Sequence, residues 1–295
     1  MKWIAFVLIA QLLNTVVVLL DRYIVSSKKV ASPAVYTFYV SLCSAFVVAM
    51  LPFGAVTIPT VTTMWLSLAA AASYIISIYF LFTSLRSSAP FDVVPVVGGV
   101  AALSTFFFSF LFLEQGLPSH FIPGFIILTL GMLLISHFNF SWHSFFALVV
   151  SGITFGLSTT LVKLLFLSDT FANGFFWSRM ANVVGALAMI ILVPNLLRHL
   201  HSDTSHSPRS GKYLVIVNKI IAGVAFFCIL LALKSGDAAL ISALSATQYI
   251  FLFLFAFFFG SMFPEYLKHS IHKHEFLRKI TATSLIVIGF FVLFL

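Results

Sequence analysis

The sequence predicts an all-α integral membrane protein whose ten transmembrane helices form two inverted repeats of five helices each. Three observations carry this prediction. Hydrophobic residues make up 61% of the 295 residues and charged residues only 8%, whereas a soluble domain carries about a quarter charged residues. The apolar residues fall in long runs with short polar connectors between them, and the two halves of the chain share a pattern. A chain with so few charges is suited to lipid as its surrounding solvent.

Ten apolar runs have the length of a membrane-spanning helix. The hydrocarbon core of a bilayer is about 30 Å thick, so a spanning helix needs roughly 20 apolar residues. Strands of a membrane barrel would instead alternate over about ten residues, a pattern that does not run through this chain. The first run lacks a cleavage site, so we expect a retained helix and not a signal peptide. The predicted helices occupy residues 3–21, 33–52, 63–86, 91–113, 120–137, 144–167, 172–194, 213–234, 238–262 and 276–295.

Positive charges in the connectors set the expected orientation. Lys and Arg gather in the connectors after predicted helices one, three, seven and nine, whereas the even-numbered connectors carry only Lys234. Connectors rich in Lys and Arg lie on the cytoplasmic side, so we expect both termini on the other side. The same distribution explains the net charge of +8 without nucleic-acid binding.

The two halves of the chain resemble each other. The best matches, at a shift of 148 residues, are Trp65-Leu66 with Tyr213-Leu214 and Leu85-Arg86-Ser87 with Leu233-Lys234-Ser235. The Phe-rich helix that follows in each half leads to a glutamate, Glu114 or Glu265. We therefore predict two repeats, residues 1–140 and 141–295. Because each repeat holds five helices, the two would run in opposite directions through the membrane, as in many secondary transporters.

Two stretches of the chain resemble a known family signature. The residues from Phe82 to Pro90, then Val94-Pro95-Val96-Val97 and Phe112-Leu113-Glu114, are similar to the EamA domain of the drug/metabolite transporter superfamily, and the residues from Leu231 to Glu265 are similar to the same pattern. The resemblance covers nearly the whole chain. It implies a ten-helix fold around a central cavity, alternating access, and transport of amino acids, other metabolites, nucleotide-sugar-like compounds or drugs.

The chain departs from the family pattern at two places. Leu113 and Pro264 stand where the family often has Gly before the glutamate. Residues 53–62 lack the basic residues that many members carry after the second helix. The second departure bears on the orientation of the termini, which in the family face the cytoplasm.

Polar side chains within the apolar runs are the candidates for solute binding, because a polar group inside a bilayer is costly. Gln11 and Asn14, for example, lie three residues apart and share one helix face. Such amides, with several Tyr rings, suit a neutral, zwitterionic or aromatic solute, and Arg179 and Lys163 would attract an anionic group such as a carboxylate. The predicted substrate-binding residues are Gln11, Asn14, Tyr74, Tyr79, Trp177, Arg179, Asn218, Lys219, Gln248 and Tyr249.

Each candidate also has a purely structural explanation. The cations Lys163, Arg179 and Lys219 could extend their charged ends to the membrane surface. The amides could hydrogen-bond a neighbouring helix. The histidine clusters at 199–206 and 269–274 fit solvated loops better than a metal site.

Other function classes find less support in the sequence. There is no phosphate-binding GxxxxGK[ST] loop and no HExxH zinc helix. A membrane-embedded enzyme or lipid-handling protein remains the alternative, although the cluster of acids, histidines or cysteines that it would need is not evident; a structural or regulatory membrane subunit is a second alternative. The acids lie at helix ends, which favours facilitated diffusion over a proton relay. We therefore expect a transporter and not an enzyme, with no cofactor or metal, a small solute and the lipid bilayer as partners, a monomeric or homodimeric state, and a plasma or inner membrane location.

Overall fold

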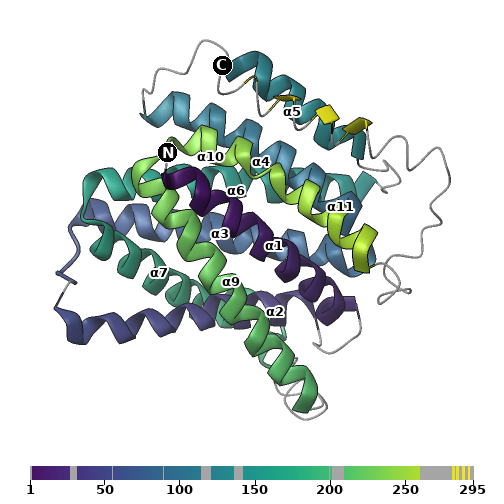
Figure 1. Ribbon diagram of the computed structural model, residues 1–295. Helices are drawn as coiled ribbons and strands as arrows, with labels where there is room; N and C mark the ends of the chain where they lie inside the picture. The colour runs from purple at the N-terminus through teal and green to yellow at the C-terminus, as the bar shows by residue number, and fades with distance from the viewer. Residues whose placement is uncertain are drawn as a thin grey trace.

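A computed structural model of the chain is a bundle of long helices (Figure 1). It describes residues 2–26, 32–54, 56–88, 90–113, 121–135, 142–198, 200 and 209–259, with the short pieces 281–282, 284–285, 288–289 and 292. Over these ranges the chain forms helices and turns and contains no strand. The elements are α1 (Lys2–Ser26), α2 (Pro33–Leu42), the 3₁₀ helix η1 (Cys43–Phe53), α3 (Val61–Ser87), α4 (Pro90–Leu113), α5 (Phe121–Ile135), α6 (Trp142–Ser168), α7 (Phe171–Leu192), α9 (Arg209–Ser235), α10 (Ala238–Leu244) and α11 (Thr247–Phe259).

The prediction of an all-helical, multi-pass membrane protein is confirmed. In the described part of the chain, 7 segments are long and apolar enough to cross a bilayer: α1, α2 with η1, α3, α4, α6, α7 and α9. The fifth predicted span corresponds to the shorter α5. The tenth, residues 276–295, lies largely outside the described residues, as do Glu114, Glu265 and the histidines at 199–206 and 269–274.

Local sequence signals account for several helix ends. Ser32, Thr60 and Thr170 are N-caps whose hydroxyl groups accept a hydrogen bond from the backbone N–H three residues later, which satisfies one of the free donors of a first turn. Pro33 and Pro90 are first helical residues, a position that needs no N–H donor. Gly54 ends η1 with φ +65°, a left-handed conformation that favours glycine.

The ninth predicted helix, residues 238–262, is not continuous, and the prediction of one unbroken helix there was wrong. It breaks at Ser245 and Ala246 into α10 and α11. The Ser245 hydroxyl donates to the Ile241 carbonyl over 3.1 Å, and the Thr247 hydroxyl donates to the Leu244 carbonyl over 2.8 Å. Hydroxyl side chains that compete for helix carbonyls weaken the regular ladder, and hydropathy alone does not register this effect.

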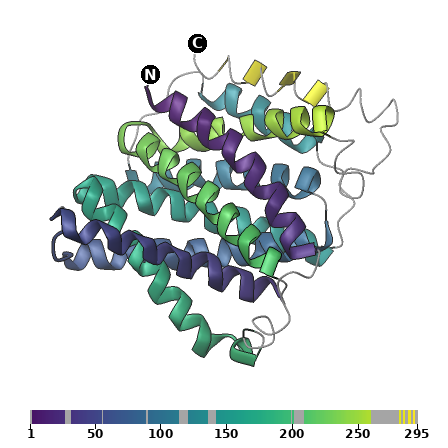
Figure 2. The same cartoon turned by 60° about the horizontal axis from the view of Figure 1, so that its bottom comes forward.

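Helices from the two halves of the sequence pack among each other. Helix α6 packs against both α3 and α4, and α1 packs against α9, α10 and α11. In Figure 1, α1 and α9 lie side by side at the front of the bundle, and Figure 2 shows the same pair from a second direction. The first helix of each half therefore contributes to the packing of the other half.

Small residues allow α6 to approach its neighbours closely. A Cβ atom on Gly152 would lie 2.6 Å from Val100, and one on Gly156 would lie 2.6 Å from Ser104. The hydroxyl groups of Ser77 and Ser151 each donate to the other residue's carbonyl over 2.9 Å, across the α3–α6 interface. Membrane helices associate through such small and hydrogen-bonding residues because lipid provides no hydrophobic drive.

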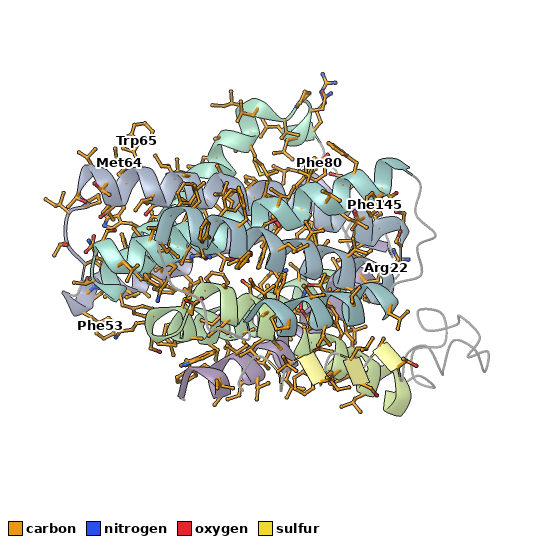
Figure 3. All side chains as sticks on the ribbon, turned by 90° about the horizontal axis from the view of Figure 1, so that it is seen from above. Arg22, Phe53, Met64, Trp65, Phe80 and Phe145 are labelled. Atoms are coloured by element: carbon orange, nitrogen blue, oxygen red, sulfur yellow. The ribbon has the colours of Figure 1, made fainter. Side chains whose placement is uncertain are left out.

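The two ends of the bundle differ in character. Figure 3 places Phe53, Met64 and Trp65 at one end and Arg22 at the other. Arg22 donates to the carbonyl of Leu85, next to Arg86, so both arginines belong to the same end. The many exposed apolar side chains along the helices are consistent with contact with lipid.

Candidate functional site

A cavity of about 260 Å³ lies inside the bundle. Helices α1, α2, α3, α4, α6, α7, α9, α10 and α11 all contribute to its wall. Drug-sized ligands occupy pockets of roughly 300–1,000 Å³, so this cavity matches a smaller molecule. Most of the wall is apolar, and the polar groups on it are few.

Seven of the ten predicted binding residues line this cavity. They come from five helices that are far apart in sequence, which the bundle brings together. These residues are Gln11, Asn14, Tyr74, Arg179, Lys219, Gln248 and Tyr249. Their role in binding stays a prediction, but the structure gathers them around one space.

Arg179 is the most unusual residue of the wall. It lies on α7, about 12 Å along the helix axis from Phe171 at a rise of 1.5 Å per residue, and it is only 7% exposed. Its guanidinium carbon lies 4.2 Å from the centre of the Phe226 ring and 5.8 Å from that of Tyr74. Among the described residues no hydrogen-bond or ion-pair partner contacts its Nε atom. Arg179 thus brings a positive charge into the cavity, where it is buried among the helices.

A second charged group lies nearer the Arg22 end. Lys219 forms an ion pair with Asp21 over 3.0 Å, and its Nζ atom lies 4.5 Å from the centre of the Tyr36 ring. Asn218 donates to Asp21 over 2.6 Å and to the Tyr36 hydroxyl over 3.1 Å, and Tyr36 donates to Asp21 as well. Because its charge is matched by Lys219 and these donors, Asp21 can stay buried.

The helix break between α10 and α11 faces the amide residues of α1. Gln11 donates to the Ser245 hydroxyl over 3.0 Å, and Asn14 contacts Gln11 over 3.5 Å. The Thr15 hydroxyl lies 3.4 Å from the Gln248 carbonyl. Interrupted helices beside a cavity are found at the substrate sites of transporters. Here the backbone N–H groups of Ser245, Ala246, Gln248 and Tyr249 are hydrogen-bonded across the break.

Tyr249, at the start of α11, links the segment after the break to α4 by a hydrogen bond. Its hydroxyl donates to the Val94 carbonyl over 2.8 Å, one residue before Pro95. A Cβ atom on Gly98 would lie 1.7 Å from the Tyr249 hydroxyl oxygen. Only glycine at position 98 therefore leaves room for this ring.

Three predicted residues do not line the cavity. Tyr79 is 37% exposed on the outer side of α3. Trp177 donates from Nε1 to the Thr57 carbonyl over 3.0 Å. Asn218 is buried behind the cavity wall, where it donates a hydrogen bond to Asp21.

Lys163, the other cation considered from sequence, has a structural role. It donates to the carbonyls of Leu233 and Gly236 over 2.7 and 2.8 Å, at the end of α9.

A cluster around Asp169 joins three segments at the other end of the bundle. Asp169 follows α6 and accepts hydrogen bonds from Thr63 over 2.8 Å, from Asn173 over 2.7 Å and from the Thr170 backbone over 2.7 Å. Asn173 in turn accepts from the Thr57 backbone over 3.1 Å. Partial burial opposes ionisation of Asp169, but these hydrogen bonds outweigh it and hold the pKa of the carboxyl group below its usual value. We call Asp169, Thr63, Asn173 and Thr57 the Asp169 cluster.

Sequence reasoning missed several residues of the wall. Asp21 was placed at a helix end and given no role, although it is buried and lines the cavity. Phe226, beneath Arg179, was one of many phenylalanines with nothing to distinguish it. Ser242 and Ser245 stand within an apolar run, and their spacing beside Gln248 is the signal that could have indicated a break.

The geometry defines a class: a multi-pass helical membrane protein with a mostly apolar cavity whose described wall holds the Asp21–Lys219 ion pair and Arg179, for which the described residues supply no counter-ion. No protein-family profile matches the chain. No curated protein matches it in sequence. The chain is similar to a protein of known crystal structure, with a TM-score of 0.65 and 17% identity over 97% of this chain and 98% of that chain. At this identity the likeness shows a shared fold across the whole chain and nothing about activity.

Proposed function

We propose that the protein is a membrane transporter that moves small metabolites of about the size of an amino acid by alternating access. The observation that carries the proposal is the cavity of about 260 Å³ with Arg179, Gln11 and Gln248 on its wall. Polar groups at depth in a bilayer are costly, so their presence there is an indication of binding or conduction. A cavity with such a wall has a use in a carrier, whereas a purely structural subunit gains nothing from it.

Two inverted five-helix repeats, and with them ten transmembrane helices, form the second part of the proposal. Helices α3 and α9 both have 27 residues, and their bounds, Val61–Ser87 and Arg209–Ser235, differ by the shift of 148 found in the sequence. If α1 corresponds to α6 and α3 to α9, the α3–α6 contact corresponds to the α1–α9 contact. By the same rule the α4–α6 contact corresponds to that of α1 with α10 and α11. This correspondence between helix contacts in the two halves supports the repeat, and it agrees with the EamA resemblance of the two stretches.

Alternating access requires contacts that close one end of the bundle in one state and open in the other. The Asp169 cluster links the segment before α3, the start of α3 and the α6–α7 turn. We infer that these hydrogen bonds hold that end closed in the present state, and that they separate when the two halves rock. We take the end that holds Arg22 and Arg86 as cytoplasmic, because Lys and Arg are enriched on that side of a membrane, and we propose a plasma or inner membrane location.

Reconstitution tests the proposal. Purified protein is first screened by thermal shift with amino acids and with hydroxy-acid and amide analogues of each, because a ligand of the folded state raises its apparent stability. Compounds that bind are then followed into proteoliposomes preloaded with the unlabelled compound. We expect saturable uptake by counterflow that protein-free liposomes lack. Binding without any counterflow would contradict the transporter assignment.

Variants of the Asp169 cluster add a conformational test. Asn173→Cys and Thr57→Cys, introduced together with replacement of Cys43 and Cys228 by serine, place a disulfide across the cluster. Oxidation should stop counterflow and reduction should restore it, because the end of the bundle can then no longer open. Full activity of the oxidised protein would contradict the gating role.

A further inference from the structure

We propose that the solute carried by this cavity is a small monocarboxylate anion with an apolar body, and that Arg179 holds its carboxylate group. The proposal rests on the transporter function for its biological meaning, but the binding itself can be measured without transport. It narrows the solute from small metabolites in general to one charge class.

The first step is the state of Arg179. It is only 7% exposed, and in the described part of the chain it has neither a carboxylate partner nor a hydrogen-bond acceptor; its recorded contacts are the rings of Phe226 and Tyr74. An aromatic ring partly compensates a buried cation, but an ionised group removed from water without a counter-ion remains unfavourable. An anionic ligand would supply the missing partner.

The second step is the charge of the cavity wall. The charged side chains among its described residues are Asp21, Lys219 and Arg179. Asp21 and Lys219 neutralise each other over 3.0 Å, so the wall presents one net positive charge. One negative charge on the ligand balances it.

The third step separates the possible anions. The planar guanidinium matches the two oxygens of a carboxylate. A phosphate monoester carries about two negative charges near neutral pH, and the second would face no free cation. The ammonium group of an amino acid zwitterion would need an anionic partner, but Asp21, the carboxylate among the described wall residues, is already engaged by Lys219, Asn218 and Tyr36. A simple monocarboxylate fits the charges better than either.

The fourth step concerns the rest of the ligand. Apart from Arg179, the Asp21–Lys219 pair and a few amide and hydroxyl groups such as Gln11 and Gln248, the wall is formed by apolar side chains such as Val17, Ile78, Phe155 and Leu230. Chloride or another small inorganic ion would leave most of the 260 Å³ without favourable contact. An apolar body, such as a ring or short hydrocarbon, gains from contact with such a wall.

Three compounds with one skeleton test the proposal: phenyllactate, an anion; phenylalanine, a zwitterion; and phenyllactamide, which is neutral. Inorganic phosphate serves as a fourth probe. Their affinities for the purified full-length protein are measured by thermal shift and by calorimetry. We expect phenyllactate to bind at least about tenfold more tightly than the other three, because it alone satisfies a charged group without adding an unmatched one.

The variants Arg179→Met, Arg179→Lys and Arg198→Met connect this preference to one residue. Arg179→Met should weaken phenyllactate binding by about tenfold to a hundredfold, and Arg179→Lys by less, because charge is kept and the planar fork is lost. Arg198 is exposed in the segment that follows α7, so Arg198→Met should bind as the natural protein does. Apparent melting temperatures confirm that each variant is folded.

Specific results would overturn the proposal. Equal binding of phenyllactamide would show that charge is not recognised, and tighter binding of phenylalanine or phosphate would assign another charge class. Phenyllactate binding unchanged in folded Arg179→Met would remove Arg179 from the site. If no carboxylate binds but a neutral solute shows counterflow, the anion proposal fails and the transporter function stands. If phenyllactate binding depends on Arg179 but no counterflow is seen, the anion site stands and the transporter function fails.

Discussion

Two buried cations, Lys163 and Arg179, lie on neighbouring helices and have opposite surroundings. Lys163 donates to two carbonyl groups at the end of α9, 2.7 and 2.8 Å away, where a helix carries partial negative charge. Arg179 contacts two aromatic rings and, over the described residues, no anion or acceptor. From sequence both were considered as cations that could attract an anionic group, but only Arg179 was predicted to bind the solute. The difference shows that a charge in a membrane helix indicates function only when its partners within the protein do not already explain it.

The largest effect is expected for Lys163→Met, which removes the donor from the end of α9. The carbonyls of Leu233 and Gly236 would lose their partner, at a cost of roughly 2–4 kcal/mol in the apparent free energy of unfolding. Unfolding by sodium dodecyl sulfate, followed by tryptophan fluorescence in micelles, measures it. Lys234→Met is the matched control, because Lys234 is exposed on the last turn of the same helix. If Lys163→Met lowers the apparent free energy of unfolding no more than Lys234→Met does, the contrast between Lys163 and Arg179 does not hold.

The next largest effect concerns the matched pair. Asp21→Asn keeps the size of the side chain and leaves Lys219 without its counter-ion. Removal of one partner of a buried pair is strongly destabilising, but the cavity can admit water to Lys219, so we expect a loss of about 1–2 kcal/mol. The wall would also gain a second net positive charge, and phosphate should then stabilise the variant in thermal shift. A variant that is as stable as the natural protein and indifferent to phosphate would contradict the charge count.

A smaller effect is expected at Asp169, an acid that is held by hydrogen bonds and only partly buried. Because its pKa in the folded protein lies below the usual value, its contribution to stability is present above that value and is lost as the pH falls through the lowered pKa. Solvent exposure limits the effect of Asp169→Asn to about 1 kcal/mol or less at neutral pH. The stability of the natural protein should therefore fall more between pH 5 and pH 3 than that of the variant, and parallel curves would contradict the hydrogen-bonded geometry.

The smallest effect on stability is expected for Arg179→Met. The variant loses the cation–π contact with Phe226 but also removes an unmatched buried charge, and the two changes oppose each other. We expect the apparent free energy of unfolding to change by less than about 1 kcal/mol. A loss as large as that of Lys163→Met would mean that Arg179 has a structural partner, and the distinction between the two cations would disappear.

Much of the fold follows from hydropathy, because length and polarity decide whether a segment can span a bilayer. The expected bounds of α3 and α7 lie within two residues of those observed. The break at Ser245 did not follow, since it depends on hydroxyl groups and on the neighbouring Gln11 of α1. Neither did the packing of α6 among helices of the first half, because hydropathy contains no information on which helices are neighbours.

The candidate site was only partly predictable for a related reason. Polar residues near the middle of an apolar run can be identified in sequence, and Gln11, Asn14 and Arg179 line the cavity. Whether a side chain faces a cavity, a neighbour or lipid depends on the rotation of its helix in the bundle. Tyr74 and Tyr79 lie five residues apart on α3, yet one lines the cavity and the other is exposed on the outside.

Counterflow of radiolabelled phenyllactate in proteoliposomes tests the central claim most directly. Natural protein, Arg179→Met and Arg198→Met are reconstituted at equal amounts of folded protein, and uptake is corrected for leakage into protein-free liposomes. We expect saturable uptake by the natural protein and by Arg198→Met, with a reduction of at least about tenfold for Arg179→Met. Equal uptake by all three preparations would contradict the account, because the unmatched charge in the cavity would then have no part in moving the solute.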